Sequence, residues 1–452
     1  MTYAGIPFLF YWIYSVVLYI FSPKNFRVLL LFILSVLWVA SWKIHWVGVF
    51  TGISLFNYLF LWFLKNKESQ SRNVGFWALV LINVSIFGIC KLGQIGSFKF
   101  TSPFGISFFM FIHIAYMIDL WRSNKAYQME KFFSFMTMPI FFPLLMGGPI
   151  IRGKDFFPQI NHLKNVEYKN VIDGILIFSL GFLKFYFLSK ELSFFDRHLY
   201  FQINHSALFI PILGIFGTFQ AYVDFSSYSD MGRGVARCFG IDLGINFKAL
   251  QYSKNPNDYW QRWNIALGTW IRDYISFPLM LRFGRKINQN IMMIISFILV
   301  GLWHGLTMNW LVFGLYNGFI IIIYNGISRI KTHPIIGKLF VFFIFVGNGL
   351  LQRPNIINEL KRIFSYQLRF NLNGFHWQMF RDNLSSNFFT AFLALMIFEL
   401  IQEWRKDTDW YIKLNLPIKT FLAILFLAWI FIGLNLHLFI EDVILPPAYF
   451  RI

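Results

Sequence analysis

The residue of this chain best suited to acid–base chemistry is His304, in the segment VGLWHGLTMNWLVFGLYNG. No Asp, Glu, Lys, Arg or Pro occurs over 291–324, so this imidazole is the only group of the run that titrates near neutral pH. Burial favours the uncharged imidazole, which is the form that a general base needs. Trp303, Trp310 and Tyr316 would form the walls of a pocket around it. The alternative is a histidine that is simply hydrogen-bonded within a helix bundle, although an ionisable group inside a membrane is by default a functional hypothesis.

A second polar candidate is Asn264, in the segment that follows Asn255-Pro256 and reads NDYWQRWNIALGTWIRDYISF. Asparagine before proline is a good helix start, and aromatic and aliphatic residues then recur at spacings of three and four. The pattern predicts an amphipathic helix that lies in the membrane interface or packs into the protein from the cytoplasmic side. Its other positions include Arg262, Arg272 and Asp273. Asn264 itself has either a functional role or an amide exposed to water, and both readings stay open.

A third polar group occurs in AYVDFSSYSDMGRG (221–234), where Tyr228 and Asp230 follow Asp224 at the end of an apolar run. The carboxylates could bind a cation, orient an acceptor, or pair with neighbouring arginines at a cytoplasmic bend. Their spacing matches no metal-ligand pattern, and the two cysteines of the chain form neither a disulfide framework nor a metal cluster. We therefore expect no metal site.

The composition indicates how these residues are held. The chain is 57% apolar and only 13% charged, whereas about a quarter of the residues in ordinary globular domains are charged. Such a chain is a polytopic, all-α membrane protein. Its formal charge of +19 fits cytoplasmic loops facing anionic lipid better than it fits a nucleic-acid partner. We expect a multi-pass protein of the cell membrane, the inner membrane if the source is Gram-negative, that begins with a membrane helix rather than a removable signal peptide.

Apolar runs of about 20 residues predict roughly eleven to thirteen membrane helices, with further interfacial or re-entrant helices. The candidate runs are 5–22, 26–41, 44–64, 75–91, 103–121, 132–149, 171–189, 207–224, 291–324 (one or two helices), 335–351, 387–403 and 418–439. We expect one integral membrane domain over 1–452. Its parts would be N-terminal helices (1–100), a catalytic core (101–330) and C-terminal helices (331–452).

The run 291–324 poses a length problem that bears on His304. As one helix it would be about 50 Å long, against a hydrocarbon core of about 30 Å. As two helices it leaves almost nothing for the turn between them. Gly301 and Gly305 flank the histidine, and glycines are where a helix can break or another backbone can approach. The sequence therefore predicts that His304 lies at a helix break, either near one surface or at membrane depth inside the protein.

At these residues the chain resembles the membrane-bound O-acyltransferase (MBOAT) family, in particular its bacterial branch of alginate O-acetylation proteins. Six blocks occur in family order: PFGISFF…YMIDLWR, GGPIIR…DFFPQI, DFSSYSDMGRG…FGIDLGINF, YWQRWNIALGTWIRDYISFPL, LWHG and a terminal PPAYFRI. The resemblance is strong over residues 100–330 and weak in the flanks.

The resemblance implies acyl transfer from a thioester to a hydroxyl, with a tunnel through the membrane core. The essential histidine of the family falls on His304, and its second polar position falls on Asn264, which could donate to the oxyanion or hold the substrate. Further substrate-binding candidates are Trp303, Arg262, Trp263, Arg272, Asp273, Tyr228 and Asp230. The sequence departs from the branch at two places: Asn264 stands where the branch usually has histidine, and 346–354 reads VGNGLLQRP instead of an aromatic-Phe-Arg-Ala segment.

The resemblance also implies the partners. No cofactor is bound, and the acyl donor is acetyl-CoA acting as a substrate, or an acyl carrier; the acceptor is an exported polysaccharide or an extracytoplasmic acyltransferase partner. Alternatives within the class are transfer of D-alanyl or of longer acyl groups from a carrier protein. A membrane transporter or flippase is the alternative from another class, although we find no repeated halves of the kind that many transporters show. A non-catalytic scaffold is a third reading.

Overall fold

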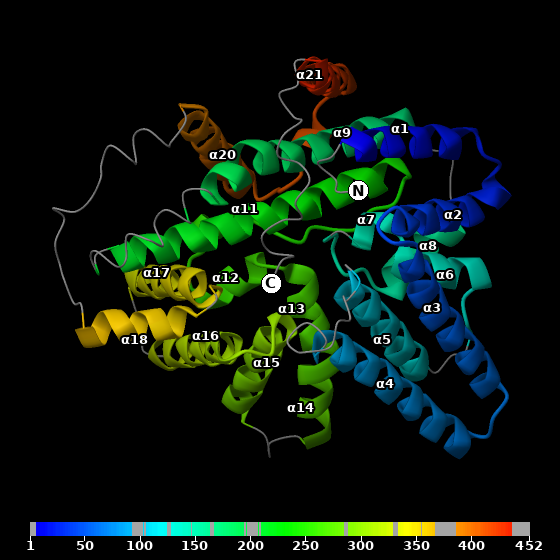
Figure 1. Cartoon of the computed structure of the whole chain (residues 1–452), viewed down its shortest axis with the longest axis horizontal. Coiled ribbons are helices and arrows are strands. Elements are labelled where there is room, and N and C mark those ends of the chain that lie inside the picture. The colour runs from blue at the N-terminus through cyan, green and yellow to red at the C-terminus, as the bar shows by residue number, and fades with distance from the viewer. Residues whose placement is uncertain are drawn as a thin grey trace. The chain divides into compact units, whose positions relative to one another are not determined.

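A computed structural model describes residues 6–92, 103, 105–123, 128–145, 147–162, 167–193, 196, 207, 209–283, 288–328, 333–353, 355–366 and 386–435. Within these ranges the chain folds into helices and no strand (Figure 1), which confirms the all-α prediction. Six helices are long and apolar enough to cross a membrane: Ile44–Lys65, Ser69–Leu92, Tyr168–Ser193, Phe209–Cys238, Met308–Ser328 and Pro334–Leu351. The chain is thus a multi-pass membrane protein.

Fewer full-length spans are seen among the described residues than the eleven to thirteen predicted. Several of the predicted runs form helices that are too short to cross a membrane. An apolar run reflects composition only and does not indicate where a helix ends. For example, α2 (Arg27–Ala40) has 14 residues and therefore extends for only about 21 Å. Likewise, 291–324 divides into α15 (Gln289–His304) and α16 (Met308–Ser328).

The chain forms two compact units, each built from several separate stretches of the sequence. The first comprises Met1–Phe182, Tyr228–Gly244 and Tyr411–Pro446, and the second Leu183–Ser227, Ile245–Trp410 and Pro447–Ile452. Helix α11 (Phe209–Cys238) contributes to both.

The first unit is a helical bundle with an aromatic core. Its helices are α1 (Ile6–Phe21), η1 (Lys24–Phe26), α2, α3 (Ile44–Lys65), α4 (Ser69–Leu92), α5 (Ile106–Arg122), α6 (Phe132–Ile140), α7 (Phe142–Leu145), α8 (Gly153–Asn161), α9 (Tyr168–Leu183), most of η6 (Trp410–Lys413) and α21 (Leu416–Asn435). Trp46, Phe50 and Phe109 are buried together between α3 and α5. The most deeply buried ion pair among the described residues of this unit joins α21 to α9: the Lys419 ammonium donates to the Asp173 carboxylate, at exposures of 2% and 1%.

The second unit holds His304 and Asn264. Its helices are η2 (Lys184–Ser189), the first part of α11, η3 (Leu250–Tyr252), α12 (Pro256–Arg262), α13 (Ile265–Ile271), η4 (Arg272–Ser276), α14 (Phe277–Phe283), α15, α16, α17 (Pro334–Leu351), α18 (Ile356–Tyr366) and α20 (Ser386–Arg405). Figure 1 shows α15 beside α16, α16 beside α17, and α17 leading into α18.

The predicted amphipathic helix begins as expected and is then interrupted. The Asn255 side chain caps α12 by accepting from the Asp258 N–H at 3.0 Å, with Pro256 in the first turn. The helix breaks at Trp263 and Asn264 and resumes as α13. Its aromatic face, including Tyr259 and Trp263, is buried, so this segment packs into the protein.

Candidate active site

His304 is the last residue of α15, and the break that the sequence predicted follows it directly. Gly305 caps the helix, and α16 starts at Met308, so three residues connect the two helices. A Cβ at Gly301 would collide with the Trp310 carbonyl oxygen, and one at Gly305 would lie 2.7 Å from Cδ1 of the Trp310 indole. The two glycines therefore let Trp310 approach the end of α15, where the histidine is.

Aromatic rings fix the plane of the His304 imidazole. The ring stacks on the Trp310 indole, with the centroids 4.4 Å apart and the planes 14° apart. Trp303 contacts it at 4.4 Å, and Phe313 meets it edge-on at 6.0 Å. The third expected wall is placed differently, because the Tyr316 hydroxyl donates to the Phe343 carbonyl at 2.6 Å. His304 is half-buried, whereas Leu306 and Met308 beyond it are exposed. The imidazole thus lies between a packed aromatic wall and an open loop.

Asn264 has a left-handed backbone, with φ 41° and ψ 57°, and its side chain is 3% exposed. Asparagine is one of the few residues that adopts this conformation readily. It stands at the N-cap of α13 without capping the helix. Asn246 caps it instead: its backbone carbonyl accepts from the Ile265 N–H at 2.9 Å and its Oδ1 accepts from the Ala266 N–H at 3.0 Å. The Asn264 side chain therefore takes no part in the cap of α13.

Two polar atoms at this helix start have no hydrogen-bond partner among the described residues. They are the acceptor Oδ1 of Asn264 and the donor Nδ2 of Asn246, and both are buried. An unsatisfied buried polar atom costs about 1–3 kcal/mol, so such atoms call for an explanation. A bound group with both a donor and an acceptor, such as a hydroxyl, would satisfy both kinds of atom.

Trp260 links this segment to the histidine hairpin, which is formed by α15, α16 and the loop between them. It lies in α12, one turn before Asn264, and packs against Phe297 of α15 at 4.9 Å and Phe313 of α16 at 6.3 Å. Phe313 in turn contacts the His304 ring. The second unit therefore connects its two candidate residues through packed aromatic side chains.

The other charged candidates of this segment are placed differently from one another. The Arg262 guanidinium is held by Asp258 Oδ1 at 2.8 Å, Glu403 Oε2 at 2.7 Å and the Ala249 carbonyl at 3.1 Å. These bonds join α12 to α20 (Ser386–Arg405) through Glu403. Arg272 is 65% exposed and pairs with Asp273 at 2.6 Å. The hydrogen bond that Arg272 donates to the Asp273 carboxylate favours the charged guanidinium and raises the pKa of Arg272.

Three further candidates contact residues other than His304 in the described part of the chain. Trp263 packs edge-on against Phe247 at 5.5 Å, within the second unit. Tyr228 and Asp230 belong to the first unit, where Tyr228 is buried and the Asp230 carboxylate accepts from Arg233 at 3.1 Å. The latter contact is the arginine pairing that the sequence offered as one alternative for these residues.

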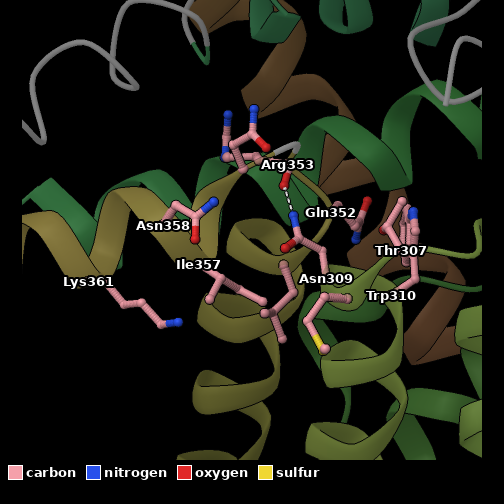
Figure 2. Close-up of a pocket in the computed structure, with 11 residues that line it drawn as sticks. Thr307, Asn309, Trp310, Gln352, Arg353, Ile357, Asn358 and Lys361 are labelled. Atoms are coloured by element: carbon pink, nitrogen blue, oxygen red, sulfur yellow. Dashed lines mark hydrogen bonds between the residues drawn. The ribbon is translucent and has the colours of Figure 1, made fainter.

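Sequence reasoning missed a cavity of about 470 Å³ next to the histidine hairpin. It lies between the starts of α16 and α18 and the end of α17 (Figure 2). Trp310, which stacks on His304, also lines the cavity. The one signal in the sequence was the polar stretch QRPNIINELK that follows the apolar run of α17.

Comparison with known proteins identifies the family. The membrane-bound O-acyltransferase family model matches residues 28–352. A "Probable alginate O-acetylase" of Pseudomonas syringae pv. tomato is 27% identical, over 82% of this chain and 74% of the relative. The "Peptidoglycan O-acetyltransferase" of Helicobacter pylori is 27% identical over 71% and 68%, and the "Teichoic acid D-alanyltransferase" of Bacillus subtilis is 26% identical over 50% and 59%. The chain belongs to the membrane-bound O-acyltransferase family and is an O-acyltransferase.

Proposed function

We propose that this enzyme moves an acetyl group from a cytoplasmic thioester, acetyl-CoA, to a hydroxyl of an exported polysaccharide or of an extracytoplasmic partner. The observation that carries the proposal is the placement of His304, half-buried at a helix break with its ring held on Trp310. The names of the O-acetylating relatives support acetyl as the acyl group. The enzyme would act in the cell membrane, the inner membrane if its source is Gram-negative.

In this mechanism the neutral His304 imidazole takes the proton of the acceptor hydroxyl as the oxygen attacks the thioester carbonyl. The tetrahedral intermediate then expels the thiolate, which receives the same proton from the imidazolium. The products are an ester and a free thiol, and the histidine returns to its neutral form. General base catalysis of this kind typically contributes a factor of about 10²–10⁴. Stacking on Trp310 would keep the ring in one orientation through both proton transfers.

Asn264 would hold the acceptor in this scheme. Its unsatisfied atom is a carbonyl oxygen, which can accept a hydrogen bond from the substrate hydroxyl or from a group beside it. This favours substrate orientation over donation to the oxyanion. The exposed Arg272 is the better placed of the two arginines to meet the phosphates of a cytoplasmic donor, since Arg262 is already bound by two carboxylates.

The proposal is tested by His304→Ala in purified protein, with acetyl transfer from acetyl-CoA to isolated cell-envelope polysaccharide as the readout. We expect kcat/KM to fall by about 10²–10⁴ while thermal unfolding in detergent stays unchanged. The matched control is His333→Ala, because His333 is an exposed histidine that caps α17 in the same unit. Transfer at the normal rate by a folded His304→Ala protein would refute the role of general base.

Transfer of D-alanyl or a longer acyl group from a carrier protein is the second candidate. The similarity to the teichoic acid D-alanyltransferases favours it, although those matches cover less of the chain than the matches to O-acetylases do. A comparison of acetyl-CoA with a D-alanyl-loaded carrier protein as donor would decide between the two. Turnover with the carrier alone would replace acetyl transfer as the proposed reaction.

A further inference from the structure

Helix α20 holds the segment that carries Asn264. Arg262 is the last residue of α12 and lies two positions before Asn264. Its guanidinium donates from Nη1 to Glu403 Oε2 at 2.7 Å and from Nη2 to Glu403 Oε1 at 3.1 Å. The two side chains are 10% and 33% exposed, so the pair is largely shielded from water. A two-pronged contact of this kind fixes the orientation of the guanidinium as well as its distance.

The same guanidinium also fixes the stretch of chain that precedes α12. Its Nη1 donates to the Ala249 carbonyl at 3.1 Å, and its Nε donates to Asp258 Oδ1 at 2.8 Å. The Arg262 carbonyl accepts from the Lys248 N–H at 3.0 Å, two residues after Asn246, which caps α13. Arg262 therefore joins the end of α12 to the stretch that caps α13.

A second carboxylate of α20 holds the same part of the chain. Glu399 is 1% exposed, and its Oε1 accepts from the Tyr222 hydroxyl at 2.6 Å while its Oε2 accepts from the Gln251 amide. One turn earlier, the Met396 carbonyl accepts from the Tyr252 hydroxyl at 3.0 Å. Gln251 and Tyr252 belong to η3, which directly precedes α12. A carboxylate is buried at low cost only where donors meet its oxygens, and these donors join η3 to α20.

The contacts of α20 lie along one face of the helix, at positions 396, 399 and 403. Residues three and four apart share a face, so a single helix supports η3 and α12 together. The supported chain is irregular at one point, because Asn264 has a left-handed backbone between two short helices. An irregular segment takes its position from its neighbours, and a misplacement of about 1 Å can cost about a hundredfold in rate.

We propose that Glu403 is a positioning residue for acyl transfer, and that it acts through Arg262 to hold the Asn264 side chain at the acceptor. The inference rests on the proposed function, which assigns the acceptor to Asn264. It adds a helix that lies beyond residues 28–352, the range that the family model matches. In this scheme Glu403 and Arg262 touch neither substrate, and their effect on the rate passes through Asn264.

The test is a double-mutant cycle of Glu403→Gln and Asn264→Gly in the purified full-length protein, with acetyl transfer from acetyl-CoA to isolated cell-envelope polysaccharide as the readout. Glu403→Gln keeps the size of the side chain and removes the charge that holds Arg262. We expect it to lower kcat/KM for the acceptor by about tenfold and to leave the KM for acetyl-CoA unchanged. The double variant should be no slower than Asn264→Gly alone, because a positioning residue has no effect once the side chain that it positions is gone.

Two further variants separate positioning from general stability, with thermal unfolding in detergent measured for each. Arg262→Lys keeps the charge but cannot form the two-pronged contact. It should therefore reproduce the loss of Glu403→Gln, and it takes the place of that variant in the cycle if Glu403→Gln does not fold. Arg405→Gln is the matched control, because Arg405 is an exposed charge of the same helix that lies over the Trp410 ring at 5.2 Å. This control should transfer acetyl groups at the normal rate.

Losses that multiply in the double variant, or a normal kcat/KM for Glu403→Gln, would overturn the inference, because Glu403 would then act on stability or not at all. A normal kcat/KM for Asn264→Gly would overturn it together with the acceptor role of Asn264. Failure of the catalytic base is seen separately, as acetyl transfer by His304→Ala with Glu403 intact. A loss shared by Glu403→Gln and Arg262→Lys that disappears in the Asn264→Gly background would establish the positioning role.

Discussion

Two buried polar sites in this molecule differ in whether their polar groups have partners. In the first unit, Lys419 is fully enclosed and its ammonium meets the Asp173 carboxylate and the Ile412 carbonyl. In the second unit, Asn264 is equally enclosed, and its Oδ1 has no partner within the described residues. The buried charges of the first site satisfy each other, whereas the buried amide oxygen of the second is unsatisfied. We accordingly propose a stabilising role for the first site and, in line with the proposed function, substrate binding for the second.

The largest effect on stability is expected when the buried pair of Lys419 and Asp173 is broken. Asp173→Ala would leave the Lys419 ammonium buried without its counter-charge, which typically costs about 3–5 kcal/mol. The measurement is thermal unfolding in detergent, together with the yield of folded protein. Asp173→Leu combined with Lys419→Met removes both charges and should restore stability. Equal unfolding temperatures for the single variant and the wild type would show that the pair contributes nothing.

A change at Asn264 should have the opposite result, with a loss of activity and little change in stability. Asn264→Gly keeps the left-handed backbone accessible and deletes only the side chain, so unfolding should change little. We expect kcat/KM to fall by roughly tenfold to a hundredfold through the loss of a hydrogen bond to substrate. Lys406→Gly, another left-handed position (φ 52°) on the surface, is the control for the backbone effect. A variant that is less stable but equally active would make Asn264 a structural residue.

The smallest effect is expected at Asn246. Its Oδ1 is satisfied as a helix cap, whereas its buried Nδ2 has no partner among the described residues. Asn246→Ala removes the acceptor for the Ala266 N–H, a cap worth about 0.5–2 kcal/mol, while the backbone carbonyl still holds Ile265. We expect a modest fall in unfolding temperature and a severalfold fall in kcat/KM. Asn246→Asp keeps the acceptor but buries an unpaired carboxylate at a position that is 1% exposed, so it should also lower the unfolding temperature. If Asn246→Ala loses activity but no stability, Asn246 acts on the substrate through its buried Nδ2 rather than by positioning α13.

Composition and periodicity were sufficient for the membrane class and for the break at His304, because both depend on local features. An uncharged run too long for one span, with glycines beside the histidine, has few ways to fold. The interruption at Asn264 was missed because it depends on Asn246, which is distant in sequence and takes over the cap of α13. The cavity was missed for the same reason, since its wall forms only where α16, α17 and α18 meet. The catalytic roles of His304 and Asn264 remain predictions for the variants above.

The left-handed backbone at position 264 has a consequence for redesign. Apart from glycine, only asparagine, aspartate and histidine enter this region with some ease, and the strain for other residues is about 1–2 kcal/mol. The backbone conformation therefore restricts substitution at position 264. Apart from glycine, the residues that it tolerates well all carry a side chain that can form hydrogen bonds. In a saturation library at this single codon, most other residues should consequently lower the free energy of unfolding by about 1–2 kcal/mol. The backbone conformation alone would therefore favour a hydrogen-bonding side chain at position 264, independently of any substrate.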